Sequence, residues 1–254
     1  MRNSIIAFAL LATVAGSATG QSSAADITAG DREYRAMRAE SALEHYERAL
    51  ATEPDDFEAL WKASRSALDL AGGPLPSNER RTQLFRTGER YAWRALELDP
   101  GDAEGHFALA RALGKSSQAL GVRDKVRYAT TIRKNALECI RLDPRHSGCH
   151  HVMGVWNAEV MRLGGFERMI ARNFLGGRAL GSASWPNAQR YLEQAVGLAP
   201  ERVVHRLELG DVYRDRGNRS AARREYETAL RLGTADYNDE RYKAQAEAAL
   251  RALP

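Results

Sequence analysis

The stretch that decides the fold is LELGDVYRDRGNRSAARREYETALRLG, residues 207–233. Its first half carries a Leu-Gly pair at 209 and 210, followed by Tyr213. Its second half carries Ala222, Tyr226 and Ala229, a small, a large and a small residue on one face of a helix. Small residues let paired helices approach closely, and large ones fill the gap between them. The stretch therefore predicts two helices packed as a pair.

The pattern of the second half occurs five times along the chain, and in four cases a proline follows it. Because proline cannot continue a helix, it marks the end of each of these segments. Five matches in one phase indicate a tandem repeat. The five sets are Ala42, Tyr46, Ala49 and Pro54; Gly88, Ala92, Ala95 and Pro100; Ile132, Ala136, Cys139 and Pro144; Ala188, Leu192, Ala195 and Pro200; and Ala222, Tyr226 and Ala229, with Thr234 in place of the proline.

These positions resemble the second helix of a tetratricopeptide repeat, and Leu209, Gly210 and Tyr213 resemble its first helix. Met153 and Gly154 match part of the same element. The resemblance implies an all-α, right-handed solenoid of about five helix pairs with a C-terminal capping helix over 238–253. The first pair is the weakest, because its leading helix lacks large apolar residues. The expected pairs span residues 31–53, 57–98, 103–142, 147–198 and 203–232.

The repeat is longer than the standard 34 residues. The prolines at 54, 100, 144 and 200 are separated by 46, 44 and 56 residues. We expect the extra residues to lie between the two helices of each central pair, as lengthened loops. In the longest of these, Phe166–Leu175 has apolar residues at helical spacing between two Gly-Gly pairs. It predicts a short amphipathic helix, either a structural brace or a mobile lid, that carries Arg168 and Arg172.

The spacing and several sequence blocks resemble the regulator of microtubule dynamics family. The blocks are IRKNALECIRLDP (132–144), HHVMGVWNAEV (150–160), FERMIARNFL (166–175) and YLEQAVGLAP (191–200). The resemblance implies a binding scaffold without catalytic activity. Some animal relatives are linked to microtubules, and one is described as carrying phospholipid in its repeat groove. Those relatives sit at organelle membranes in the cytosol, so we do not expect microtubule binding to transfer to an exported chain.

The N-terminus predicts that export. Arg2 precedes an apolar run from Ile5 to Val14 and then small residues, the pattern of a secretory signal peptide. The run is too short to span a bilayer. Cleavage fits after Gly20 or after Ala25, and an uncleaved anchor is the alternative. We expect residues 1–25 to form the leader and a short linker, residues 26–254 to form one domain, and the protein to be periplasmic or secreted.

Charge is unevenly distributed. The formal net charge is +4. Residues 111–190 hold 14 Lys and Arg against 5 Asp and Glu, which gives +9, so the remaining residues carry 4 − 9 = −5. A basic centre favours an anionic partner, such as an anionic lipid, although a solvated charged face gives the same pattern. No nucleic-acid partner is expected.

Two cysteines, Cys139 and Cys149, stand on either side of Pro144. In an exported protein they can form a disulfide, or Cys139 is simply the small residue of its repeat. His146, His150 and His151 lie beside Cys149, but no second cluster completes a metal site. We therefore expect neither a metal nor another cofactor. The sequence has no nucleophile elbow, phosphate-binding loop or metalloprotease helix, so we do not expect an enzyme.

The repeat frame also predicts a binding groove. In proteins of this type, the fifth and ninth residues of each first helix line the concave surface. An aromatic and apolar column with arginines beside it suits an amphipathic peptide or an apolar ligand with an anionic end. We expect a scaffold that binds a protein or peptide partner, with a lipid carrier as the alternative; core packing would explain the aromatic residues equally well. The fifth positions are Trp61, Phe107, His151 and Leu207, and the ninth positions are Arg65, Arg111, Val155 and Asp211.

Overall fold

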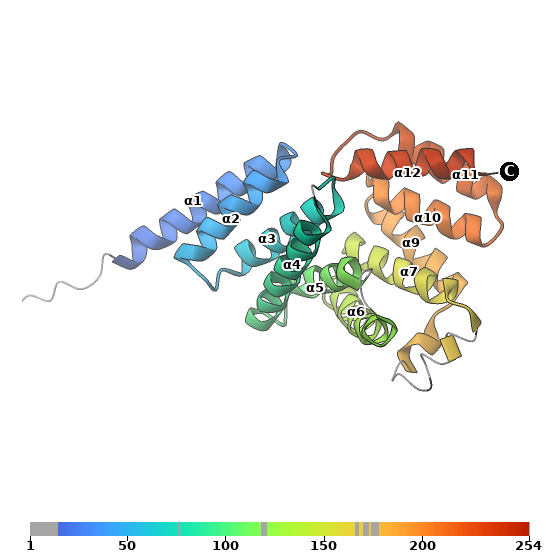
Figure 1. Cartoon of the computed structure of the whole chain (residues 1–254), viewed down its shortest axis with the longest axis horizontal. Helices are drawn as coiled ribbons and strands as arrows, with labels where there is room; N and C mark the ends of the chain where they lie inside the picture. The colour runs from blue at the N-terminus through green and yellow to red at the C-terminus, as the bar shows by residue number, and fades with distance from the viewer. Residues whose placement is uncertain are drawn as a thin grey trace, which may run out of the picture.

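The described part of the chain folds as five consecutive helix pairs and one closing helix (Figure 1). The computed structural model describes residues 15–75, 77–117, 121–165, 168–169, 173 and 178–253, and these contain no strand. The short helix η2 (Arg178–Ser182) precedes α9, and α12 (Asp239–Arg251) closes the array. The pairs are α1 (Ala15–Arg35) with α2 (Ala39–Thr52), α3 (Phe57–Gly72) with α4 (Asn78–Leu98), α5 (Ala103–Ser116) with α6 (Val122–Leu142), α7 (Ser147–Arg162) with α9 (Trp185–Leu198), and α10 (Val203–Asp215) with α11 (Arg219–Arg231).

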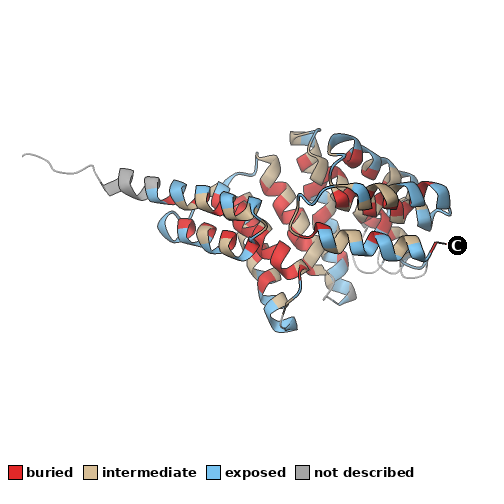
Figure 2. Ribbon diagram, turned by 90° about the horizontal axis from the view of Figure 1, so that it is seen from above, coloured by how far each residue is buried: buried red, intermediate tan, exposed pale blue. Residues whose placement is uncertain are grey.

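The residues that defined the repeat form the interior. All three pattern positions in each of the five second helices are buried, which confirms the predicted repeat. A Cβ added at Gly210 would lie 2.5 Å from the ring of Tyr226, so the glycine lets α10 approach α11 closely. Buried residues consequently run through the middle of the array, with exposed residues on its outside (Figure 2).

Polar residues and prolines set the helix ends. Asp56, Ser77 and Asp102 each accept a hydrogen bond from a backbone N–H in the first turn of the helix that follows them. The second helices α2, α4, α6 and α9 each end two residues before the proline of their repeat. A proline disfavours the helical conformation in the residue that precedes it, which explains this boundary.

The extra residues of the repeat lie in different places from pair to pair. In the second and third pairs most of them lengthen the second helix, because α4 and α6 have 21 residues each against 14 in α2. In the fourth pair they lie between the helices as predicted, where residues 163–184 connect α7 to α9 and include η2. Most of the predicted amphipathic helix at Phe166–Leu175 lies outside the described residues.

The first pair is a full repeat. Its leading helix α1 begins at Ala15, and so includes residues that the sequence assigned to the leader and linker. A Cβ at Gly30 would lie 2.5 Å from the Tyr46 ring, the same approach as between Gly210 and Tyr226. Each tyrosine donates a hydrogen bond to the aspartate after its glycine, Tyr46 to Asp31 at 2.8 Å and Tyr226 to Asp211 at 2.7 Å. The sequence feature that could have indicated this full repeat is the glycine sixteen residues before the tyrosine, which both pairs share.

No helix in the described part of the chain is both long enough and apolar enough to cross a membrane.

Candidate functional site on the first helices

Four predicted groove residues come together between α3 and α5, whose helices are in contact. Trp61 and Arg65 from α3, with Phe107 and Arg111 from α5, line one pocket. Its volume is about 10 Å³, room for about one water molecule. The four residues therefore form a shallow, aromatic and cationic surface.

Arg65 is the cation of this surface that has no ion-pair partner in the described part of the chain. Its guanidinium lies 3.6 Å from the centre of the Tyr34 ring and 5.0 Å from that of Trp61. Among the described residues, no carboxylate oxygen lies within 4.0 Å of it, and its buried Nε has no hydrogen-bond partner. Stacking on the two rings and a 3.5 Å hydrogen bond from its Nη2 to the hydroxyl of Tyr46 hold the guanidinium in place, and no carboxylate of the described residues pairs with it.

Arg111, in contrast, is already paired. Its Nη2 lies 2.5 Å from Oδ1 of Asp69, a side chain with only 3 % of its surface exposed. Burial opposes the charge of Arg111, but Asp69 and then Tyr34 raise its pKa above the ordinary value. Tyr34 donates a second hydrogen bond to Asp69, at 2.7 Å. Arg111 is thus held as a structural cation.

On α7 and α10, a pair of histidines takes the place of the aromatic and cationic residues found on α3 and α5. His151 faces His205, with the two Nδ1 atoms 3.1 Å apart and the ring centres 4.8 Å apart. Burial, followed by the neighbouring His205, lowers the pKa of His151 well below 6.5. Burial also lowers the pKa of His205 to about 3. The two rings are neutral at physiological pH, and one donates to the other.

The structure differs from the prediction at Leu207. This residue is 4 % exposed and packs in the core of the last repeat with Ala246 and Leu253. The reason is that α12 lies against α10, so the closing helix covers the groove position there. Val155 packs at the edge of an apolar cluster, and Asp211 is engaged by Tyr226 and Arg214.

Three polar residues of this region were not predicted from the sequence: Asp69, His205 and Glu208. Asp69 lies one turn beyond Arg65 on α3, a spacing that continues the column and could have indicated it. Glu208 is half-buried on α10. Burial and the nearby Asp211 raise the pKa of Glu208 to about 7, although Arg162 and Lys115 act against this.

The histidine pair gives a pH prediction. Unfolded histidine has a pKa of 6.5, so on acidification the unfolded chain takes up the proton before the folded one does. The free energy of unfolding therefore falls from pH 6.5 towards pH 3, by up to about 1.4 kcal/mol per pH unit for one histidine. We expect His205→Asn to flatten this decline in urea unfolding at pH 7.5, 6.0 and 4.5. Glu208 changes the free energy of unfolding with pH in the opposite direction, but its contribution is the same in both proteins and cancels when their slopes are compared. Equal slopes for both proteins would contradict the lowered pKa of His205.

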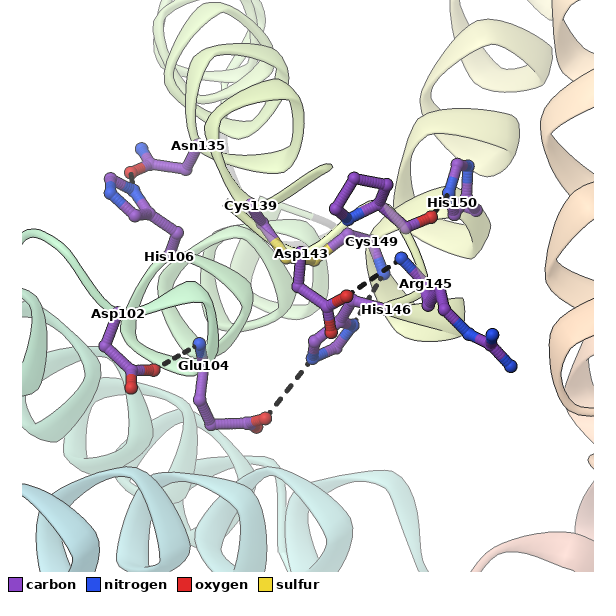
Figure 3. The surroundings of a disulfide bond; sticks show 11 residues. Asp102, Glu104, His106, Asn135, Cys139, Asp143, Arg145, His146, Cys149 and His150 are labelled. Carbon is purple, nitrogen blue, oxygen red and sulfur yellow. Dashed lines mark hydrogen bonds and ion pairs between the residues drawn. A yellow bond between two sulfur atoms is a disulfide. The ribbon is translucent and has the colours of Figure 1, made fainter. Parts of the chain in front are cut away.

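The cysteines are joined. A disulfide links Cys139 of α6 to Cys149 of α7 with 6.2 Å between their Cα atoms, and Figure 3 shows it beside the turn that connects the two helices. His146 caps α7 by accepting from the backbone N–H of Cys149, and its Nε2 lies 3.2 Å from Glu104. His146 and the two sulfur atoms lie within 4.8 Å of one another, but both sulfurs are committed to the disulfide.

We expect Cys149→Ser to lower the free energy of unfolding by about 2–3 kcal/mol, because the bond restricts the unfolded chain. Urea unfolding with and without dithiothreitol measures the effect. Reductant should shift the natural protein and leave Cys149→Ser unchanged; identical curves for both proteins in oxidised form would rule this contribution out.

Only one of the two arginines of the predicted basic insertion lies within the described residues. Arg168 donates to the backbone oxygen of Met161 at 2.8 Å, which ties it to the end of α7. Arg172 lies outside the described residues. The described candidate site is therefore the surface formed by Trp61, Arg65, Phe107 and Arg111 on α3 and α5, which we name the inner surface, and not this insertion.

The helix pairs, their buried pattern and the closing helix define a tetratricopeptide-repeat solenoid. The fold is similar to that of a thermophilic tetratricopeptide repeat protein of Thermus thermophilus, with a TM-score of 0.60 and 21 % identity over 89 % of this chain and 99 % of that one. It is also similar to pilF of Pseudomonas aeruginosa, with a TM-score of 0.53 and 15 % identity over 93 % of each chain. Proteins with this fold commonly act as interaction scaffolds.

The family model "Regulator of microtubule dynamics protein 1-3" matches residues 26–254, and the chain belongs to this family. It is 26 % identical to regulator of microtubule dynamics protein 1 of Mus musculus, over 67 % of this chain and 55 % of that protein. It is 25 % identical to protein 3 of Xenopus laevis, over 66 % of this chain and 36 % of that protein. The chain thus spans about half the length of the mouse relative, and less of the frog protein.

Proposed function

We propose that this chain is an exported, non-catalytic scaffold that binds a protein or peptide partner on the inner surface formed by α3 and α5. Arg65 carries the proposal. It is a fixed cation, stacked on two aromatic rings and without a carboxylate partner among the described residues. Beside it, Trp61 and Phe107 offer aromatic surface. An acidic side chain or a terminal carboxylate next to an apolar residue would satisfy both.

The shape of the site favours a peptide over a lipid. An acyl chain needs an enclosed apolar cavity of a few hundred Å³, typical of ligand pockets. The pocket between Trp61 and Phe107 has a volume of about 10 Å³ and is bordered by the charged Glu104 and Arg111. A shallow surface of this kind supports docking of a side chain rather than sequestration of a lipid tail.

Export is supported by the sequence of residues 1–25 and by the disulfide. Disulfides persist in oxidising compartments such as the periplasm and are rare in the cytosol. Sequencing the N-terminus of the mature protein tests this part of the proposal. We expect a start at Gln21 or Asp26, after cleavage following Gly20 or Ala25; an intact Met1 on soluble protein would contradict it.

The binding proposal is tested by affinity capture from envelope extracts. We expect one defined protein to be captured by the natural chain and its recovery to fall at least tenfold with Arg65→Glu, which reverses the unpaired charge. Arg223→Glu is the matched control, because Arg223 is exposed on the second helix α11. Capture that Arg65→Glu leaves unchanged would contradict the proposal, and a co-purifying lipid in native mass spectrometry that Trp61→Ala removes would favour the carrier.

A further inference from the structure

The end of the solenoid returns to its beginning. Residues 236–242, which we name the clamp, comprise the end of the connection from α11 and the first turn of α12, and Tyr237 and Asn238 lie against the C-terminal end of α3. Figure 1 shows the start of α12 reaching back to the top of α3 and α4. Segments about 170 residues apart in the chain therefore meet beside Asp69, on the helix that also carries Trp61 and Arg65.

Asn238 makes the central contact of the clamp. It occupies the N-cap position of α12, but its side chain makes no cap hydrogen bond. Instead its Nδ2 donates to the backbone oxygen of Asp69 at 3.2 Å and to Oδ1 of the same residue at 3.3 Å. The residue is 5 % exposed. An asparagine in a position suited to local capping is thus used for a long-range contact.

Two tyrosines flank this contact. The ring of Tyr237 packs on the core formed by the first two helix pairs, and a Cβ at Gly73 would lie 3.3 Å from it, so the glycine leaves room for the ring. On the other side, Lys115 of α5 donates to the hydroxyl of Tyr242 at 3.3 Å. The clamp therefore bridges α3 and α5, the two helices that form the candidate site.

The chemistry around Asp69 selects the group that binds it. Arg111 already balances its charge at 2.5 Å, and Tyr34 occupies the other carboxylate oxygen. A second cation there would face Arg111, whereas a neutral amide donates without adding charge. The site thus suits a carboxamide side chain preceded by an aromatic one, the pair that Tyr237 and Asn238 present.

The clamp can leave without unfolding the array. Beyond it, α12 is held on the last repeat by Ala246 and Leu253, which are buried in the core there. Residues 233–235, which lead into the clamp, are exposed and have no helical structure. Release requires movement of this connection and of the first turn of α12, and it breaks the 2.6 Å ion pair between Asp236 of the clamp and Arg202.

We propose that the clamp is an internal occupant of the Asp69 end of α3, next to the surface formed by Trp61, Arg65 and Phe107, and that a partner segment with an aromatic residue followed by Asn or Gln replaces it there. The assignment of this surface to a partner rests on the proposed function above. The clamp itself rests on the contacts of Asn238, so the two claims can fail separately.

The test uses the full chain and a labelled synthetic peptide of residues 233–243, GTADYNDERYK. Asn238→Asp places a carboxylate against Asp69 and should release the clamp. Asn218→Asp is the matched control, since Asn218 caps α11 and is exposed. We expect the peptide to bind Asn238→Asp at least tenfold more tightly than the natural chain or the control. Hydrogen exchange of residues 66–73 and 236–242 should accelerate at least tenfold in Asn238→Asp, and not in the natural chain or in Asn218→Asp.

Asn238→Ala, which removes the donor without adding charge, is measured in parallel and should change in the same direction. Equal peptide affinity for all four proteins, or unchanged exchange at residues 66–73, would overturn the clamp. A clamp that opens as expected, together with envelope-protein capture that ignores Arg65→Glu, would instead overturn the proposed function and leave the clamp intact.

Discussion

Replacing Asp69 with alanine is expected to lower the free energy of unfolding by about 3–5 kcal/mol, the cost of leaving a buried ionic partner uncompensated. The carboxylate is 3 % exposed and receives hydrogen bonds from Tyr34 of α1, Arg111 of α5 and Asn238 of the clamp. Its removal leaves the guanidinium of Arg111 without its counter-ion and separates three parts of the array that the side chain joins.

Asp69→Asn is the control for this prediction. The amide keeps one acceptor oxygen and the volume of the side chain, so we expect a smaller loss, about 1–3 kcal/mol. Urea unfolding followed by circular dichroism at pH 7.5 measures both variants. A loss below about 1 kcal/mol for Asp69→Ala would mean that the network carries little of the stability.

The second large effect is expected at Tyr226, which is fully buried in the last repeat. Tyr226→Ala removes the ring that packs on Gly210 and should cost about 3–5 kcal/mol, as for other large aromatic residues in protein cores. Tyr226→Phe keeps the ring and loses only the 2.7 Å hydrogen bond to Asp211, so its cost should be about 1 kcal/mol. The same unfolding experiment separates them. Equal losses would show that the hydroxyl, and not the packing of the ring, holds this repeat together.

The repeat was predictable because it depends on local spacing. Small residues at fixed spacing specify which face of each second helix is buried, and a proline follows four of the five helices; the structure buries the pattern positions. The length of α4 and α6 was not predictable in the same way. Residues 78–87 are strongly polar, and polar residues at helix ends are compatible with both a loop and a solvated turn of helix.

The candidate site was predictable only where it follows the repeat frame. Trp61, Arg65, Phe107 and Arg111 are brought together because α3 and α5 occupy equivalent places in successive repeats. Leu207 occupies an equivalent place too, but α12 covers it. The link between Asn238 and Asp69 spans most of the chain, and no periodic pattern indicates a contact of that kind.

The central claim is that the surface around Trp61, Arg65 and Phe107 contacts the partner, and site-specific photocrosslinking in living cells tests it most directly. A benzoylphenylalanine replaces Phe107 in one variant and Trp93, which is 40 % exposed on the second helix α4, in the other. We predict an adduct with one envelope protein from position 107, its loss when Arg65→Glu is added, and none from position 93. An adduct from position 93 alone, or one at position 107 that Arg65→Glu leaves unchanged, would contradict the account.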